Sequence, residues 1–135
     1  MRTKTKNNGA VFLIVVFAIA LMATITVGIL VMTTEEVQLM QNQLYSAQAL
    51  CTAEAGLNDA FAEIRANSGW TTGFTDKSFN GGTYDVTVTG TLPTRTITSI
   101  GTSPQGYDAN VMADVTIGSS YPHIIRIDSM KINGF

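Results

Sequence analysis

Few residues in this chain have side chains suited to chemistry, and their spacing assembles no catalytic group. His123 is the only histidine and Cys51 the only cysteine, and the two are far apart in the sequence. A single thiol excludes an intramolecular disulfide and a CxxC metal site. Ser46 and Ser68 lack the pattern of an activated nucleophile. We therefore predict that the chain is not an enzyme and holds no cofactor.

Two groups of acidic and amide side chains have the oxygen atoms that cations prefer. Asp108, Asn110 and Asp114 offer such ligands for calcium, but they lack the spacing of an EF-hand and lie partly on a predicted strand. Glu35 and Glu36 stand just beyond a long apolar segment, where acidic side chains are usually solvated. We predict that these residues are structural or face solvent, and that they form no metal site.

The first element of the chain is a long apolar helix. Ala10 to Met32 is a run of 23 residues without a charge. At a rise of about 1.5 Å per residue, the run is long enough to cross a hydrocarbon core about 30 Å thick. Thr24 and Thr26 are tolerable in lipid because their hydroxyls can bond to carbonyls of the preceding turn. We predict a membrane-spanning helix over residues 10–32, preceded by a basic leader, residues 1–9.

Basic residues are concentrated in that leader. Arg2, Lys4 and Lys6 are three of eight basic residues, so the chain without its leader has five basic residues against ten acidic ones. Nucleic-acid binding needs clustered Lys and Arg, so this class of partner is not indicated. The positive-inside bias predicts a cytoplasmic N-terminus, with the chain after about residue 33 on the far side of the membrane.

The helical pattern continues without a stop signal over residues 33–66 and becomes amphipathic. Asn67, Ser68 and Gly69 supply the stop signals. We predict that one apolar face packs on the rest of the chain and that a second, thinner stripe packs against something else, with Cys51 buried as a small hydrophobe. The first face consists of Leu50, Ala53, Leu57, Ala60, Phe61 and Ile64, with Leu50, Leu57, Phe61 and Ile64 as its core; the second consists of Val37, Met40, Leu44, Ala47 and Cys51.

The remaining residues, 67–135, form a β-rich part. Trp70 to Gly82 is predicted to be a loop, because it is rich in Thr, Gly, Asp and Asn. Alternating patterns and turn signals predict four strands at Thr83–Thr91, Arg95–Ile100, Ala109–Ile117 and Ile124–Ile132. The fold class is therefore α+β: a long N-terminal helix, half transmembrane and half amphipathic, packed by its C-terminal part on a small antiparallel sheet.

The leader and the long helix together resemble a known family. The sequence NNGAVFLIVVFAIALMATITVGILVMTTEEVQLMQNQLYSAQALCTAEAGLNDA is similar to the N-terminal region of type IV pilin-like proteins, nearest to minor pilins with a stretch like Ala49–Leu57. The resemblance implies cleavage of a class III leader by a prepilin peptidase after Gly9 and N-methylation of Ala10. It also implies assembly with other pilin or pseudopilin subunits through the apolar helix, and a small sheet packed on the helix end.

Three positions depart from the family pattern. Most members carry Glu at the fifth residue after the cut, where this chain has Ile14. Ala10 stands where Phe is most frequent, and no proline interrupts the apolar segment, so Gly28 is the better candidate for local melting. In lacking the carboxylate, the chain resembles minor pilins and tip pseudopilins rather than a major subunit.

We therefore predict a structural subunit, minor and at the tip, of a type IV pilus or a type II secretion pseudopilus. It would span the inner membrane once before assembly and then belong to an extracytoplasmic filament. Two alternatives stay open: a membrane-anchored extracytoplasmic binding module outside any filament, and a secreted protein cut by ordinary signal peptidase within Ala18–Ala23. The first residue of the mature protein separates the three, as Ala10, Met1 or a residue near Thr24.

Overall fold

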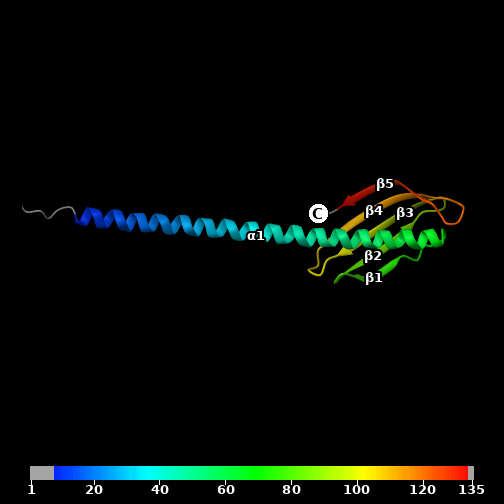
Figure 1. Cartoon of the computed structure of the whole chain (residues 1–135), viewed down its shortest axis with the longest axis horizontal. Helices are drawn as coiled ribbons and strands as arrows, with labels where there is room; N and C mark the ends of the chain where they lie inside the picture. The colour runs from blue at the N-terminus through cyan, green and yellow to red at the C-terminus, as the bar shows by residue number, and fades with distance from the viewer. Residues whose placement is uncertain (1–7, 134–135) are drawn as a thin grey trace, which may run out of the picture. The chain divides into compact units, whose positions relative to one another are not determined.

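The computed structural model describes residues 8–133 (Figure 1). Most of the predicted leader, residues 1–7, lies outside the described residues. The chain divides into two compact units, Met1–Gln41 and Asn42–Phe135. The elements follow in the order α1 (Asn8–Ala66), β1 (Phe74–Phe79), β2 (Gly82–Thr89), β3 (Thr94–Thr102), β4 (Asp108–Ile117) and β5 (Ile125–Asn133).

Helix α1 ends at the predicted stop signals. The amide of Asn67 donates to the carbonyl of Glu63 at 2.8 Å, which completes the last turn. The Asn67 side-chain oxygen then accepts from the amide of Gly69 at 2.9 Å, and the Asn67 carbonyl accepts from Trp70 at 3.0 Å. An Asn side chain that accepts a hydrogen bond from the backbone amide two residues later competes with the helical hydrogen-bond pattern. The helix therefore ends here and the chain turns.

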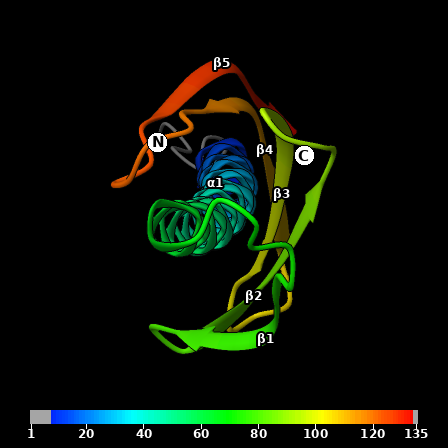
Figure 2. The ribbon, with the colours of Figure 1, turned by 90° about the vertical axis from the view of Figure 1, so that its right-hand side faces the viewer.

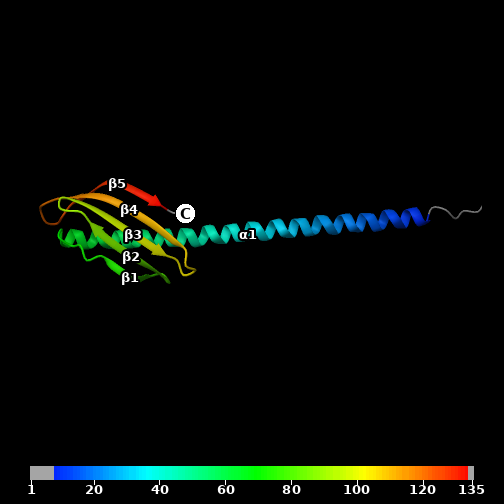
Figure 3. The same ribbon diagram turned by 180° about the vertical axis from the view of Figure 1, so that it is seen from behind.

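The five strands form one antiparallel sheet in chain order, β1-β2-β3-β4-β5. Figure 3 shows them side by side in this order from the back. Seen along the helix, the sheet curves around residues 42–66 of α1, with β1 at one rim and β5 at the other (Figure 2). The predicted fold class is confirmed: a long N-terminal helix packs by its C-terminal part on an antiparallel sheet.

Strand β1 corrects the prediction of a loop over Trp70–Gly82. It pairs with β2, and all of its residues after Phe74 are exposed. An edge strand with solvent on nearly every side chain has no alternation of apolar and polar residues, so the pattern that revealed the other strands is absent. The register also shifts between Phe74 and Lys77, and Asp76 has a positive φ of 48°. Pairing with β2, rather than its own sequence, makes this segment a strand.

The core lies between residues 49–64 of α1 and the inner face of strands β2, β3 and β4. Leu57 and Ile64 are fully buried in it, while Leu50 and Phe61 are partly buried and pack against it. The strand residues predicted to point inward are buried as well: Tyr84, Val86 and Val88 on β2, and Val111, Ala113, Val115 and Ile117 on β4.

Two glycines let the helix and the sheet approach closely. A Cβ on Gly101 of β3 would overlap the Ala49 carbonyl oxygen and the Ala53 amide nitrogen of α1. A Cβ on Gly56 would likewise overlap the Ser99 hydroxyl and lie 2.7 Å from the Tyr84 ring. Strand backbone therefore packs directly on helix backbone at Gly101, and helix backbone packs on side chains of the sheet at Gly56. This close approach explains why small residues mark the buried face of the helix.

Cys51 is exposed, which corrects the prediction that it is a buried hydrophobe. The helix packs through its small residues, such as Ala49 and Ala53, and this leaves the stripe ending in Cys51 on the side facing solvent. The thiol instead lines a shallow groove of about 330 Å³, together with Leu44, Phe79 and other residues.

A polar cluster ties the edge strand β1 to the helix. The Lys77 ammonium group on β1 lies 2.6 Å from the Asp59 carboxylate of α1, and the Tyr84 hydroxyl donates to the same oxygen. Lys77 also stacks on the Phe74 ring at 4.3 Å from its centroid. The hydrogen bonds from Lys77 and then Tyr84 lower the pKa of the Asp59 carboxyl, although burial opposes them.

This cluster predicts an acid-sensitive contribution to the stability of the Asn42–Phe135 unit. Because the folded pKa of Asp59 lies below its ordinary value of 3.8, the contribution is fully present above that value and is lost as the pH falls through the folded pKa. Asp59→Asn should therefore reduce the fall in the urea midpoint of unfolding as the pH is lowered from about 5 to 2. Glu54→Gln, at an exposed carboxylate on the same helix, is the control. If both variants reduced this fall equally, the acid-sensitive contribution could not be assigned to Asp59.

Candidate functional site: an exposed apolar helix

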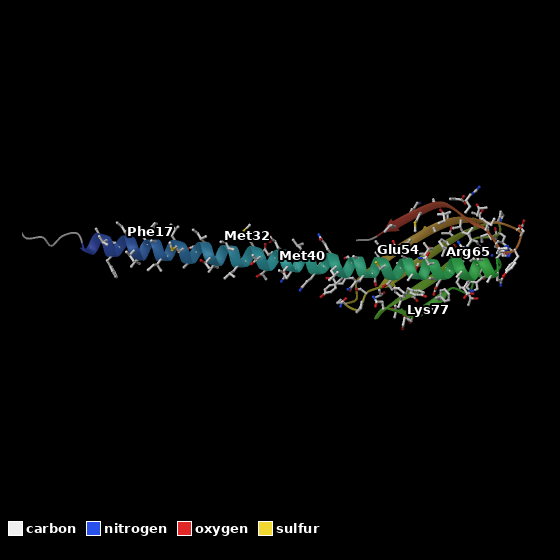
Figure 4. All side chains as sticks on the ribbon, viewed as in Figure 1. Phe17, Met32, Met40, Glu54, Arg65 and Lys77 are labelled. Carbon is white, nitrogen blue, oxygen red and sulfur yellow. The ribbon has the colours of Figure 1, made fainter. Side chains whose placement is uncertain are left out.

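The apolar segment of α1 is the most unusual surface of the described chain. It carries no charge from Ala10 to Met32, and every residue of this run is exposed. Phe12, Phe17 and Met32 are among its large side chains, and each is exposed. Figure 4 labels Phe17 and Met32 on this segment. Water is a poor solvent for such a surface, and the helix is long and apolar enough to cross a membrane.

The polar atoms within this segment are satisfied inside the helix. The Thr24 hydroxyl donates to the Ala20 carbonyl at 2.6 Å, and the Thr26 hydroxyl donates to the Met22 carbonyl at 2.8 Å. Thr33 and Thr34 make the same kind of bond to the Leu30 carbonyl at 2.9 Å each. These hydroxyls need no water, so they add little cost to burying the helix in an apolar medium.

The residues of the predicted processing site lie in the first turns of α1. Gly9 and Ala10 are both exposed, and a Cβ built on Gly9 meets nothing within 4 Å. Gly28, the predicted weak point of the helix, is equally open, and α1 is unbroken there. Packing against the other described residues requires neither glycine.

Two of the three candidate calcium ligands on β4, Asp108 and Asp114, are engaged with neighbouring strands, whereas Asn110 Oδ1 is buried with no hydrogen-bond partner among the described residues. The Asp108 carboxylate accepts from the Thr102 hydroxyl at 2.7 Å. Asp114 accepts from Thr96 at 2.7 Å and from Ser129 at 2.8 Å, and these hydrogen bonds lower the pKa of its carboxyl. Among residues 8–133, no three His, Cys, Asp or Glu side chains are grouped to hold a metal ion. The carboxylates act as clamps between strands.

The other candidate residues stay apart. His123 Nδ1 donates to the Gly118 carbonyl oxygen at 2.8 Å, in the turn between β4 and β5. Glu35 and Glu36 are exposed on α1. Ser46 lies on α1, whereas Ser68 follows the end of that helix.

The sequence patterns missed a buried charged side chain. Arg95, at the start of β3, is 8% exposed, and its Nη1 donates to the Gly90 carbonyl at 3.2 Å. The alternation through Ile97 and Ser99 would have placed Arg95 on the inner face of the sheet, because every second residue of a strand shares a face. Its Nε has no hydrogen-bond partner within the described residues.

The same α1 thus carries two different surfaces in sequence order. In the described part of the chain, one helix is long and apolar enough to span a membrane, and it lies near the N-terminus. Its later residues form the helix face that packs on the sheet. Comparison of the chain with protein-family models, with curated protein sequences and with solved structures finds no match.

Proposed function

We propose that this chain is a structural subunit of an extracytoplasmic filament of the type IV pilin-like class. The observation that carries the proposal is the fully exposed, uncharged apolar surface of α1 over residues 10–32, on a helix whose later part packs on a small antiparallel sheet. Such a surface serves as a membrane anchor before assembly and as a packing surface among like helices afterwards. The role is structural rather than enzymatic.

Processing at the N-terminus is part of the proposal. A prepilin peptidase would cut between Gly9 and Ala10 and leave Ala10 as the methylated first residue. The basic leader favours a cytoplasmic N-terminus, with the sheet on the opposite side of the inner membrane. A chain that only anchors a binding module would keep Met1, whereas an ordinary secreted protein would begin near Thr24.

The processing step makes a testable prediction. N-terminal sequencing of the mature protein should begin at Ala10. Gly9→Leu should leave full-length precursor in the membrane and none in filaments, because a side chain at the scissile position would block a narrow peptidase site. Gly28→Leu is the matched control, since a Cβ there also meets nothing within 4 Å. Normal cleavage of the Gly9→Leu variant would contradict the assigned peptidase.

Ile14 supports a position at the filament tip. A new N-terminal amine among apolar helices is a buried charge, and a buried charge without a partner is costly. A subunit with Glu near its terminus can neutralise the amine of a neighbour above it. This chain has Ile14 there, and its nearest acids, Glu35 and Glu36, lie about 30 Å farther along the helix. At the top of a filament no subunit above requires that carboxylate.

The tip position predicts a distinct phenotype. Deletion of the gene should reduce the number of filaments far more than their length, because an initiating subunit acts once per filament. Labelled protein should be found at one filament end in electron micrographs. Uniform labelling along the shaft, at a stoichiometry near that of the major subunit, would rule out the tip while leaving the filament class possible.

A further inference from the structure

The groove beside Cys51 is lined by uncharged side chains only. It encloses about 330 Å³ and lies between α1, the turn that joins β1 to β2 and the turn that joins β3 to β4. No Lys, Arg, His, Asp or Glu of the described chain lines it. The groove is therefore suited to a neutral ligand, because an ion would lose its hydration there without gaining a counter-charge. Helix α1 contributes Leu44, Gln48 and Cys51, and the turns contribute Phe79 and Gln105, among others.

Both turns that wall the groove are held in place by their own chain. Asn80 and Gly81 have φ angles of 47° and 85°, the pair of positive values that a type I′ hairpin turn requires. In the other turn, the Ser103 amide donates to the Tyr107 carbonyl at 2.8 Å. The Tyr107 hydroxyl then donates to the side-chain oxygen of Asn42 on α1 at 2.7 Å. The groove is thus preformed, so a ligand would not have to order its walls.

Three primary amides line this preformed space. Gln48, Asn80 and Gln105 each offer a carbonyl acceptor and an NH₂ donor group. The Gln48 Oε1 atom is buried and has no hydrogen-bond partner among residues 8–133. The neighbouring Thr52 hydroxyl is already used, since it donates to the Gln48 backbone carbonyl at 2.9 Å. A buried acceptor without a donor is costly, so this atom favours a ligand that brings an O–H or N–H group to it.

Much of the remaining lining is apolar. Phe79 and Leu44 are 44% and 56% exposed, and Pro104 belongs to the turn between β3 and β4. An apolar face of a ligand would remove these side chains from water. A pyranose ring combines the two features, because its C–H groups form an apolar face and its hydroxyls, each a donor and an acceptor, surround the rim. The volume is at the lower end for small-molecule sites, so it suits a single ring.

We infer that this groove binds a neutral pyranose ring, which packs on Phe79 and donates one hydroxyl to Gln48 Oε1. The amides of Asn80 and Gln105 bind its other hydroxyls. The ring is a free monosaccharide or the terminal unit of a glycan. A peptide fits less well, because peptides dock on free strand edges, long apolar grooves or aromatic-lined channels, whereas two tight turns wall this groove. The inference goes beyond the proposed function and does not depend on it, since a filament subunit and an anchored binding module could both carry the site.

The native thiol reports on the occupancy of this groove. Cys51 is exposed, lines the groove and is the only cysteine, so its rate of alkylation by iodoacetamide, followed by mass spectrometry, measures access to the site in the full-length chain. The chain is held in a detergent without a sugar headgroup and titrated with glucose, galactose, mannose and N-acetylglucosamine. Ligands this small bind with a Kd of about 1–10 mM. Because only the free fraction reacts, about 100 mM of at least one sugar should slow alkylation about tenfold or more.

Two variants remove the features that recognise the ring. Phe79→Ala removes the apolar wall, and Gln48→Met replaces the amide by a side chain of similar length. Each should weaken binding about tenfold, so the ratio of the alkylation rates without and with sugar should fall to about two. Tyr121→Ala and Gln43→Met are the matched controls, because they remove an exposed ring and an exposed amide outside the groove. Both should keep full protection. Sorbitol, an open-chain polyol, should give none.

Equal protection by sorbitol, full protection in both groove variants, or no protection by any of the sugars would overturn the proposal. Disaccharides that end in the effective ring distinguish the source: protection at a lower concentration than the monosaccharide indicates a glycan, equal concentrations indicate a free sugar, and both results support the site. The processing test is independent. A mature protein that begins at Ala10 but shows no protection would retain the filament function and lose the site, whereas a protected protein that keeps Met1 would do the reverse.

Discussion

Gly101→Val is expected to abolish cooperative folding of the Asn42–Phe135 unit. The first atom of any side chain at Gly101 would overlap the Ala49 carbonyl oxygen and the Ala53 amide nitrogen. Those atoms belong to the backbone of a helix, so no rotamer change can relieve the overlap. The helix must move away from the sheet, and this movement disrupts the close packing along the whole contact between α1 and the sheet. A domain stable by about 5–15 kcal/mol cannot lose that core and stay folded.

The measurement is urea unfolding of a fragment beginning at Thr34, followed by circular dichroism. Thr98→Val is the matched control, because it places the same side chain on the same strand but on the outer face of the sheet. The control should unfold cooperatively like the parent. Gly101→Ala already introduces the overlapping atom and should be destabilised too. A cooperative transition for Gly101→Val with an unchanged midpoint would show that the helix does not sit this close to β3.

Leu57→Asp is also expected to abolish cooperative folding of this unit, through the burial of a charge rather than through steric overlap. Leu57 is 2% exposed in the centre of the core. A carboxylate there would be desolvated without a charged partner, and burying an isolated charge is far costlier than removing methyl groups. Leu57→Ala only creates a cavity and should cost about 2–5 kcal/mol.

The neighbouring residue supplies the control for this series. Asn58 is exposed on the same helix turn, so Asn58→Asp adds the same charge at almost the same place in the sequence. It should shift the urea midpoint of the fragment very little. If Leu57→Asp and Asn58→Asp behaved alike, the buried face of the helix would have to be reassigned.

Alternation was a reliable guide to the inner strands of the sheet. In β4, the residues from Val111 to Ile117 read inward and outward in turn, and the inward ones are buried as the pattern predicts. The end of α1 was predictable for a similar reason, because Asn67 bonds locally to the chain after it. Both features depend on neighbours in sequence, which is what a sequence pattern records.

The predicted packing face of the helix is confirmed, since Ala53, Leu57, Ala60 and Ile64 are buried and Leu50 and Phe61 pack against the core. The sequence pattern did not predict how closely the helix approaches the sheet, and therefore which side chains of the face are fully covered. The side chains opposite decide this: Gly101 on β3 brings the sheet so close that only small residues fit beneath it. Cys51 is exposed for the same reason, since it lies off that line.

Features that depend on pairing with another strand leave no pattern in the sequence of the strand itself. Strand β1 forms because it pairs with β2, and the residues of β5 that face inward are set by a shift of its register against β4. Neither cause is visible in the residues of the strand itself. The candidate assembly helix, by contrast, was evident from the run of uncharged residues alone, because solvent preference is a property of composition.

The order of the strands also has a kinetic consequence. Each strand pairs with the next one in the chain, so the sheet consists only of local hairpins, and such low-contact-order structures form quickly. The inner row of Val and Ile would then be uncovered if the sheet formed first. Synthesis proceeds from the N-terminus, so α1 has already emerged when β1 and β2 appear. Each hairpin can therefore pack on the helix as soon as it is synthesised. The apolar inner face of the sheet is then covered before it can associate with another chain.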